Sequence, residues 1–190
     1  DALNTNTTAS NNVAIGANAM DANTTGTRNT AIGNTALDAN TTANDNTSVG
    51  HAALGANTTG SLNVAMGSQA LYLNTTGTYN TALGYSALYA NTTAGSNTAM
   101  GYNSMAANTT GTSNTALGAY ALTTNQTGID NVSIGRSSLY NNTGSYNTAV
   151  GKQALSANTT GGANVSSGWR SMFFNTTGAN NTASGYQALY

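Results

Sequence analysis

The chain has 190 residues, of which 5% are charged, and its formal net charge is −1. Because it contains no Cys, it has neither a disulfide framework nor a thiolate metal site. Four Lys and Arg residues provide no basic stripe for nucleic acid or for an anionic membrane surface, and no segment is apolar for long enough to cross a bilayer. We therefore expect no nucleic-acid partner, no membrane insertion and a fold held by packing alone.

A short phrase returns every seventeen residues along the chain. Residues 80–84 read Asn-Thr-Ala-Leu-Gly, and residues 97–101 read Asn-Thr-Ala-Met-Gly. With one deletion before the ninth copy, the glycine that closes the phrase recurs at Gly16, Gly33, Gly50, Gly67, Gly84, Gly101, Gly118, Gly135, Gly151, Gly168 and Gly185. A fixed period of this kind indicates a repeat architecture, so residues 1–190 are predicted to form a single array of eleven units.

Neither end of the array carries a capping sequence. Asp1 lies two positions past a notional glycine and Tyr190 lies five past Gly185, so both ends fall within a unit. A solenoid normally needs polar caps to protect its terminal edges. Since no signal segment precedes the repeats either, we expect a processed or excised piece of a longer array, or end-to-end stacking of copies.

A unit of seventeen residues is too short for a two-helix repeat, and heptad spacing is absent. The unit therefore predicts an all-β fold, a parallel β-solenoid (β-roll) of about eleven 17-residue coils. One short strand is expected in the Asn-Thr-Ala-Leu-Gly phrase and a second from Ser-Ala-Leu-Tyr to Asn-Thr-Thr, with turns between them. If each coil rises by one strand spacing of ~4.8 Å, the rod is roughly 50 Å long.

Two apolar series recur along the array and predict its core. The residue four past each glycine is always Leu or Met, whereas the residue just before the glycine is large and apolar except at Ser167 and Ser184. The core residues predicted from the first series include Leu37, Leu54, Leu71, Leu88, Leu122 and Leu139, and those from the second series include Ile32, Leu83 and Leu117. Two large apolar residues per unit make a thin core.

Asn occupies two positions of nearly every unit, seven and thirteen past the glycine. Stacked coils align these residues into two columns, whose amides can bond to one another and to the turn backbone, so we predict two structural Asn ladders. The first ladder includes Asn23, Asn40, Asn57, Asn74, Asn91 and Asn108, and the second includes Asn29, Asn46, Asn63, Asn80, Asn97 and Asn114.

A second interpretation of the first column is open, because Asn-Thr-Thr is an N-glycosylation acceptor and occurs in nine units. A glycan on every coil would place bulky groups ~4.8 Å apart, which is very crowded. The second column is just as regular without being an acceptor. These observations favour the ladder, and decoration of Thr hydroxyls is left open.

A small residue precedes the large one in both apolar series, as in Ala36-Leu37 and Ala82-Leu83. Neighbours on a strand face opposite sides. A large residue inside the coil therefore places the small one outside, where only close packing would limit its size. We predict that a second copy of the chain packs against these small residues; the alternative is that they face a tight corner of the coil.

The sequence favours no enzymatic function. His51 is the only His, and Asp21 and Asp38 share one position in adjacent coils, the kind of pair that shares a proton or holds a cation. No basic partner, third ligand or acid–base constellation accompanies them. We therefore expect no enzyme, no metal site and no cofactor.

Aromatic residues recur at the same position in successive coils, as Tyr72 with Tyr89, Tyr85 with Tyr102, and Trp169 with Tyr186. Stacked exposed rings offer flat apolar faces with a polar edge, which suits a carbohydrate, so these six residues are candidate glycan contacts. Aromatic ladders also stabilise sheets or form subunit contacts, and the sequence favours this interpretation over glycan binding.

Ice binding is a further alternative, because Thr columns on a flat solenoid can match a lattice. The two Thr of Asn-Thr-Thr are expected to point to opposite sides. A Thr-x-Thr spacing is found only in units such as Thr25-Gly26-Thr27. This irregular spacing disfavours an ice-binding face.

The phrase Asn-Thr/Val-Ala-Ile/Leu-Gly, followed by a small residue, Leu and an Asn/Thr-Gly turn, resembles the head repeats of trimeric autotransporter adhesins, which stack into a parallel β-roll shared by three chains. It is also similar to Asn-Thr-Ala-Leu-Gly-Tyr arrays of phage tail-fibre-like and bacterial surface proteins. The resemblance covers the whole chain, although the unit is longer than in typical adhesin heads. It implies an extracellular fibrous or adhesive element at a cell or virion surface.

We therefore expect the chain to be the structural shaft of an extracellular fibre or adhesin. Its main partner would be itself, in a trimer or an end-to-end filament, and surface carbohydrate is a second candidate partner. A glycan-binding or ice-binding solenoid is the alternative.

Overall fold

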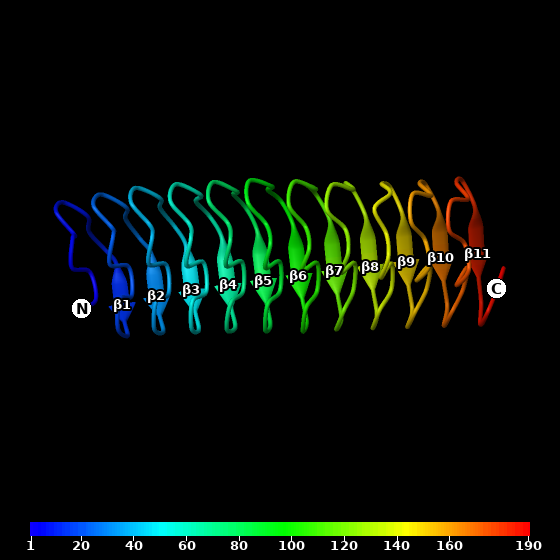
Figure 1. Ribbon diagram of the computed structural model, residues 1–190, viewed down its shortest axis with the longest axis horizontal. Coiled ribbons are helices and arrows are strands. Elements are labelled where there is room, and N and C mark those ends of the chain that lie inside the picture. Colours follow the sequence, from blue (N-terminus) through cyan, green and yellow to red (C-terminus); the bar gives the residue numbers. More distant parts are fainter.

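The computed structural model describes residues 1–190 as a rod in which eleven short strands follow one another along one axis, with the two termini at opposite ends (Figure 1). The strands are β1 (Val13–Ile15), β2 (Thr30–Ile32), β3 (Thr47–Val49), β4 (Val64–Met66), β5 (Thr81–Leu83), β6 (Thr98–Met100), β7 (Thr115–Leu117), β8 (Val132–Ile134), β9 (Thr148–Val150), β10 (Val165–Ser167) and β11 (Thr182–Ser184). They form one parallel sheet in sequence order. The predicted all-β parallel solenoid is confirmed.

The register of the sheet follows the period of the sequence. Most residues pair with the residue seventeen positions later, as Leu83 does with Met100. Between β8 and β9 the step is sixteen, because Val132 pairs with Thr148. The missing residue is removed from the turn that follows Asn142, so the strands on both sides keep the same phase and the rod continues unbroken.

Each coil contains one strand, and the prediction of a second strand from Ser-Ala-Leu-Tyr to Asn-Thr-Thr is wrong. This segment forms turns, because Ser86 and Leu88 adopt φ angles of 49° and 54°. Left-handed residues interrupt an extended backbone, and the same conformation recurs at both positions in every coil. The coils are nevertheless tightly joined, since 102 of the 122 backbone hydrogen bonds lie outside the strands.

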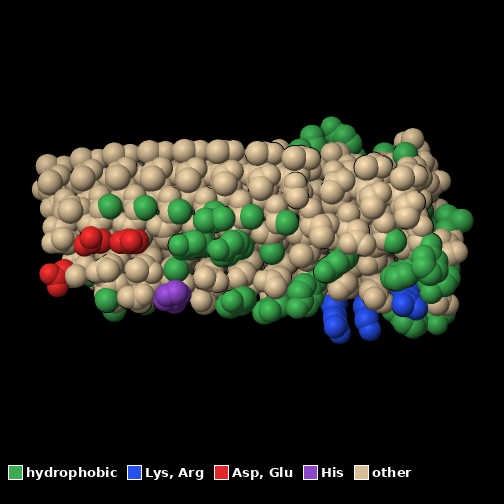
Figure 2. Space-filling model, viewed as in Figure 1, with side chains coloured by type: hydrophobic (Ala, Val, Ile, Leu, Met, Phe, Trp, Pro, Cys, Tyr) green, Lys and Arg blue, Asp and Glu red, His purple; other side chains and the backbone are tan.

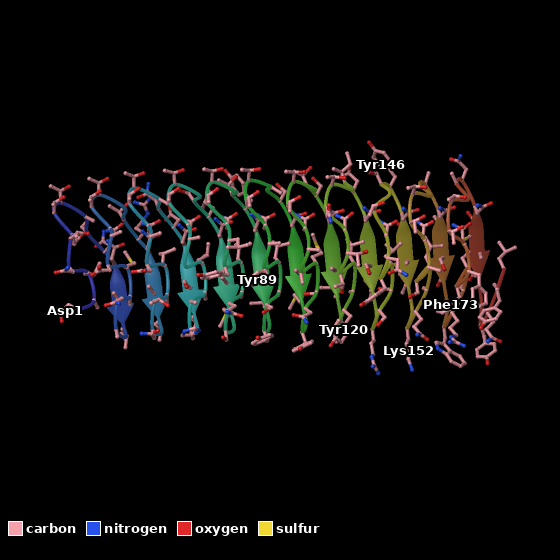
Figure 3. All side chains as sticks on the ribbon, viewed as in Figure 1. Asp1, Tyr89, Tyr120, Tyr146, Lys152 and Phe173 are labelled. Atoms are coloured by element: carbon pink, nitrogen blue, oxygen red, sulfur yellow. The ribbon has the colours of Figure 1, made fainter.

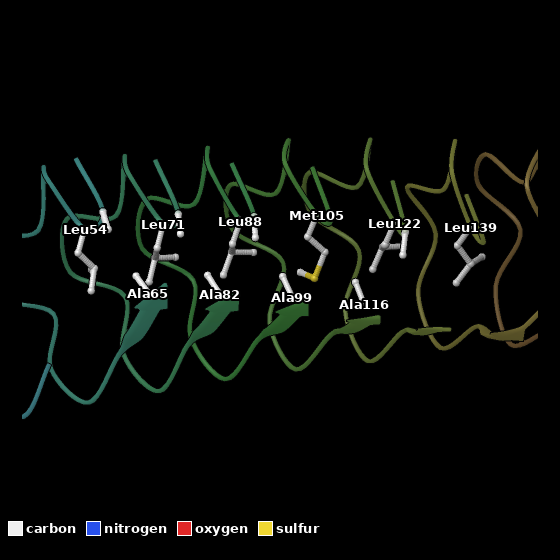
Figure 4. Packing of buried hydrophobic residues seen from close by; sticks show 14 of the residues in the cluster. Leu54, Ala65, Leu71, Ala82, Leu88, Ala99, Met105, Ala116, Leu122 and Leu139 are labelled. Atoms are coloured by element: carbon white, nitrogen blue, oxygen red, sulfur yellow. The ribbon is translucent and has the colours of Figure 1, made fainter. Parts of the chain in front are cut away.

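The Leu or Met four past each glycine fills the interior of the coil (Figure 4). The predicted core residues of this series, Leu37, Leu54, Leu71, Leu88, Leu122 and Leu139, are all fully buried, which confirms their placement. They form one row along the rod, and the small central residues of the strands, such as Ala65 and Ala82, form a facing row. One large side chain per coil thus meets methyl groups from the opposite wall.

The second apolar series does not belong to the core, and the prediction for Ile32, Leu83 and Leu117 is wrong. In each three-residue strand the central residue points inward and its two neighbours point outward. Ile32 is exposed, and Leu83 and Leu117 are partly exposed. The row of Leu and Met from the opposite wall already fills the interior, so the strand has room for only Ala or Ser there.

The small residues lie inside the coil, so the prediction that they form an outer contact surface is also wrong. Both Ala36 and Ala82 are fully buried. Ala82 is the inward residue of its strand. Ala36 and Leu37 are buried together because Leu37 has a φ of 54° and does not alternate with its neighbour as strand residues do. The small residues therefore fit the alternative prediction, in which they face a tight corner of the coil.

The first Asn ladder runs through the interior and is interrupted once, at the deletion. There Asn142 donates to the Gly144 carbonyl and not to Asn125, and the ladder resumes where Asn158 donates to Asn142. The Asn74 amide nitrogen donates to Oδ1 of Asn57 at 2.8 Å and to the carbonyl of Gly77 at 3.0 Å, and its own Oδ1 accepts from Asn91. The same two donor bonds recur at Asn23, Asn40, Asn57, Asn91, Asn108 and Asn125. These side chains have all their donors and acceptors in use, which confirms the predicted ladder.

The second ladder joins side chains to the backbone. Oδ1 of Asn63 accepts the backbone N–H of Asn80 at 2.9 Å, and the Asn63 amide donates to the carbonyl of Gly77 at 2.9 Å. Asn29, Asn46, Asn80, Asn97 and Asn114 repeat both bonds. The Gly77 carbonyl therefore accepts from both ladders, and no buried side-chain polar atom lacks a partner.

Burial decides between the ladder and N-glycosylation for the interior copies of Asn-Thr-Thr. Asn57 and Asn74 are fully buried, and both amide hydrogens of Asn74 are engaged. Attaching a sugar would replace one of these hydrogens and would require the coil to open. In the folded rod these Asn residues are therefore structural.

The glycine that closes each phrase should be irreplaceable. Gly84 has a φ of 128°, and a Cβ built on it would lie 2.7 Å from the carbonyl oxygen of Gly101. We expect Gly84→Ala to lower the free energy of unfolding by about 2 kcal/mol or more, measured by urea denaturation. Gly162→Ala is the control, since Ala179 occupies the equivalent position in the next coil. Equal stability of the two variants would contradict this account.

The ladders should be as sensitive as the core. Asn80→Ala removes the acceptor of the Asn97 N–H and one donor to the Ala94 carbonyl, both within the interior. We expect a loss of about 2–3 kcal/mol, because buried polar groups are left unpaired. Circular dichroism during urea unfolding measures it, with the exposed Thr93→Ala as the control. A loss under ~0.5 kcal/mol would mean that water replaces the amide without cost.

Candidate functional site

The outward face of the parallel sheet is a regular surface that extends along the rod. Its residues are the first and third of each strand, a column of Thr and Val beside a column of large apolar residues. Ile15 is 59% exposed, Met66 45% and Met100 40%. We call these two columns, over β1 to β11, the outer sheet face. A regular apolar strip of this length is unusual on a protein surface that only water covers.

The outer sheet face carries no charged side chain from β1 to β11. The large apolar column becomes polar only at Ser167 and Ser184, near the C-terminal end of the rod. This lapse is the signal in the sequence that the series lies outside, because the buried series four past the glycine never turns polar. Sequence reasoning placed the apolar column inside and therefore missed this face.

The two Thr of Asn-Thr-Thr have different environments. Thr75 is half-buried, and its hydroxyl donates to the carbonyl of Thr92 at 3.1 Å, whereas Thr76 is exposed. The first Thr of the pair makes the same bond at most other coils, including Thr24, Thr41, Thr58, Thr92 and Thr109. One hydroxyl of each pair is thus committed to the fold, and the other column of hydroxyls faces water.

The six aromatic residues named as candidate glycan contacts lie in three pairs of neighbouring rings. The ring centroids are 5.6 Å apart for Tyr72 and Tyr89, 5.5 Å for Tyr85 and Tyr102, and 4.8 Å for Trp169 and Tyr186. The first two pairs are stacked and the third is tilted. Tyr120 extends the second column with an edge contact to Tyr102 and lies on the same edge of the rod as Lys152, whereas Tyr146 lies on the opposite edge (Figure 3).

On the face drawn in Figure 2, acidic and basic side chains lie toward opposite ends of the rod. Figure 2 shows acidic side chains near the N-terminal end, basic side chains near the C-terminal end, and hydrophobic side chains and the single His between them. Arg28 and Asp45 form the ion pair of the chain, with Nε and Oδ1 at 2.7 Å. The hydrogen bond from Arg28 holds the pKa of Asp45 below its ordinary value. An exposed pair of this kind contributes little to stability.

Asp21 and Asp38 come together as predicted for one column of adjacent coils. Burial, and then the negative charge of Asp21, raise the pKa of Asp38 above its ordinary value. No group of three or more His, Asp or Glu side chains gathers in the geometry of a metal site. The structure also contains no helix with the length and apolarity needed to span a membrane.

No protein-family model, curated protein or solved structure matches this chain. The geometry of its surfaces is therefore the basis for assigning a function.

The raised pKa of Asp38 predicts a pH dependence of stability. Because the folded state disfavours the carboxylate, stability falls as pH rises from the ordinary Asp value near 3.9 through the raised value. We expect Asp38→Asn to be more stable than the unmodified chain at pH 7, by less than ~1 kcal/mol because solvent screens the site, and equal to it at pH 3. Melting temperatures at both pH values measure this. Asp130→Asn controls for the loss of one exposed carboxylate, and a less stable Asp38→Asn at pH 7 would contradict the assignment.

Proposed function

We propose that this chain is a structural rod, the shaft of an extracellular fibre or adhesin, and that copies of it associate laterally through the outer sheet face. The observation that carries the proposal is the apolar column that runs from β1 to β9 on an uncharged face of the sheet. The resemblance of the repeats to adhesin heads and fibre arrays supports the extracellular placement. A role without catalysis fits a molecule that repeats one set of contacts along its whole length.

A second copy of the chain is the partner that best fits this face. A strip three residues wide covers about 10 Å, so a rod of roughly 50 Å offers about 500 Å² per copy. Two copies would bury about 1,000 Å², which is the lower end of the range for specific interfaces. Because the face has no charge, identical copies meet there without repulsion. Sheets pack face to face at ~10 Å through side chains of this kind.

The contact between copies proposed here uses the outer sheet face, whereas the sequence predicted it at the small residues such as Ala36 and Ala82. Those residues are buried inside the coil, so substituting them would disrupt the core. The outward residues of β5 to β7 are better places to test association, because changes there leave the core and the ladders untouched.

The test is the triple variant Leu83→Thr, Met100→Thr and Leu117→Thr. Thr suits an outward strand position, so the fold should persist. We expect its dissociation constant for self-association to rise at least tenfold, and association of the unmodified chain to strengthen in sulfate, as apolar contacts do. Analytical ultracentrifugation measures both, and electron microscopy shows whether the assembly is a bundle or a filament.

A matched control removes three exposed apolar side chains elsewhere, as Leu62→Asn, Leu73→Asn and Tyr79→Asn. If the control dissociates as readily as the triple variant, the contact lies outside the outer sheet face. If the unmodified chain stays monomeric at millimolar concentration, lateral association is wrong. Thermal hysteresis measured on such a monomer would then favour the ice-binding alternative.

A further inference from the structure

Gly55 is the one residue without a side chain in the column five past the closing glycine. Five past the closing glycine, successive coils carry Asp21, Asp38, Gly55, Tyr72 and Tyr89. Gly55 leaves a hollow of about 310 Å³, open to solvent, between the coil of Asp38 and that of Tyr72. The backbone there does not adopt the left-handed conformation that favours glycine, so the conformation of the chain does not demand a glycine at this position. Without a side chain at Gly55, the Tyr72 ring lies close against this coil and forms one wall of the hollow.

The walls of the hollow combine an aromatic face with polar groups. The ring of Tyr72 lies so close that a Cβ on Gly55 would be 3.0 Å from its Cε2. Asp38 lines the hollow together with Asn34, His51 and Gln69. Arg28 and Asp45 bind each other, so no cation neutralises the Asp38 carboxylate, which is left with free acceptor capacity.

A pyranose ring has the complementary chemistry. Its C–H face packs against an aromatic ring, and its hydroxyls donate to a carboxylate and exchange hydrogen bonds with amides. Ligand sites typically join an apolar wall to a few such polar groups in a volume of at least ~300 Å³. We propose that the Gly55 hollow is a saccharide-binding site, with Tyr72 as the stacking platform and Asp38, Asn34 and Gln69 as the hydroxyl-binding groups.

The surroundings define the class of saccharide. Asp21 and Asp38 give this part of the rod a negative charge, which repels sialylated or sulfated sugars, so the ligand is a neutral saccharide. A second hollow shares Gln69 and is lined by Tyr85, Tyr89 and Tyr102. Because the two hollows follow each other along the rod, the site accommodates an oligosaccharide of more than one ring.

The first experiment is an array of immobilised oligosaccharides, neutral and sialylated, probed with the labelled chain. A neutral oligosaccharide that binds is then titrated into ¹⁵N-labelled protein. We expect saturable shifts of the backbone amides at Gly55 and Gln69, and at least tenfold weaker binding of the sialylated form of the same sugar. Tenfold corresponds to about 1.4 kcal/mol. If no neutral saccharide binds, the proposal is wrong.

Two variants locate the site. Gly55→Tyr displaces the Tyr72 ring from this coil and occupies the hollow, and it should fold because Tyr72 and Tyr89 already stack at this position in the next two coils. We expect it to abolish binding. Tyr72→Ala should weaken binding at least tenfold through loss of the platform.

The control is Tyr146→Ala, which lies several coils from Gly55 and on the edge of the rod opposite Tyr120 (Figure 3), and it should bind as the unmodified chain does. Circular dichroism confirms that each variant is folded. Binding that survives Gly55→Tyr, or that falls equally in Tyr146→Ala, would overturn the assignment. The result is independent of lateral association, because the triple variant of the outer sheet face keeps the hollow and should bind equally well.

Discussion

The solenoid depends on one backbone carbonyl per coil, which lies in the turn that follows the Asn of the first ladder. Gly60 accepts from Asn57 of its own turn at 2.8 Å and from Asn46 of the preceding phrase at 2.9 Å. One oxygen thus closes a turn and ties it to the neighbouring coil. Because both lone pairs are used and water is excluded, losing either amide leaves a buried polar atom unpaired. The single deletion respects this constraint, since Gly144 still accepts from both Asn131 and Asn142.

These bonds offset an unusual amount of unfavourable backbone conformation. Each coil has three non-glycine residues with positive φ, such as Gln69, Leu71 and Tyr79, besides its closing glycine. Each such residue costs on the order of 1 kcal/mol. The core provides only one large side chain per coil, so packing alone cannot compensate for this cost. Interlocking hydrogen bonds between coils therefore constrain the length of the repeat. The one coil of sixteen residues keeps the second ladder and loses a single amide–amide bond of the first.

Much of this fold can be predicted from the sequence, because its strongest constraints recur. The buried Leu series and both Asn columns are visible as positions that scarcely vary. The exposure of Ile32 and the burial of Ala36 were harder to predict. Ile32 lies outside because the Leu and Met row already fills the interior, and Ala36 lies inside because the backbone at Leu37 is not extended. Alternation holds only in extended segments, and Leu37 at a φ of 54° breaks it without any Gly or Pro to signal the change. The hollow at Gly55 can be predicted only by comparing the residues five past the glycine in successive coils, where Gly55 stands between Asp38 and Tyr72.

The same constraints divide the repeat into positions that hold the rod and positions that are free to vary. The closing glycine, the Leu or Met and the two Asn contact the same atoms in every coil, so a change there disrupts its neighbours. The residues one and five past the glycine vary. The first position holds residues as different as Ala17 and Arg136, and the second holds residues as different as Gly55 and Tyr72. Because coils in a solenoid interact only with adjacent coils, such outward changes have little effect on stability elsewhere. A uniform scaffold of this kind can therefore acquire a local recognition site, as proposed at Gly55, while the outer sheet face stays apolar from β1 to β9.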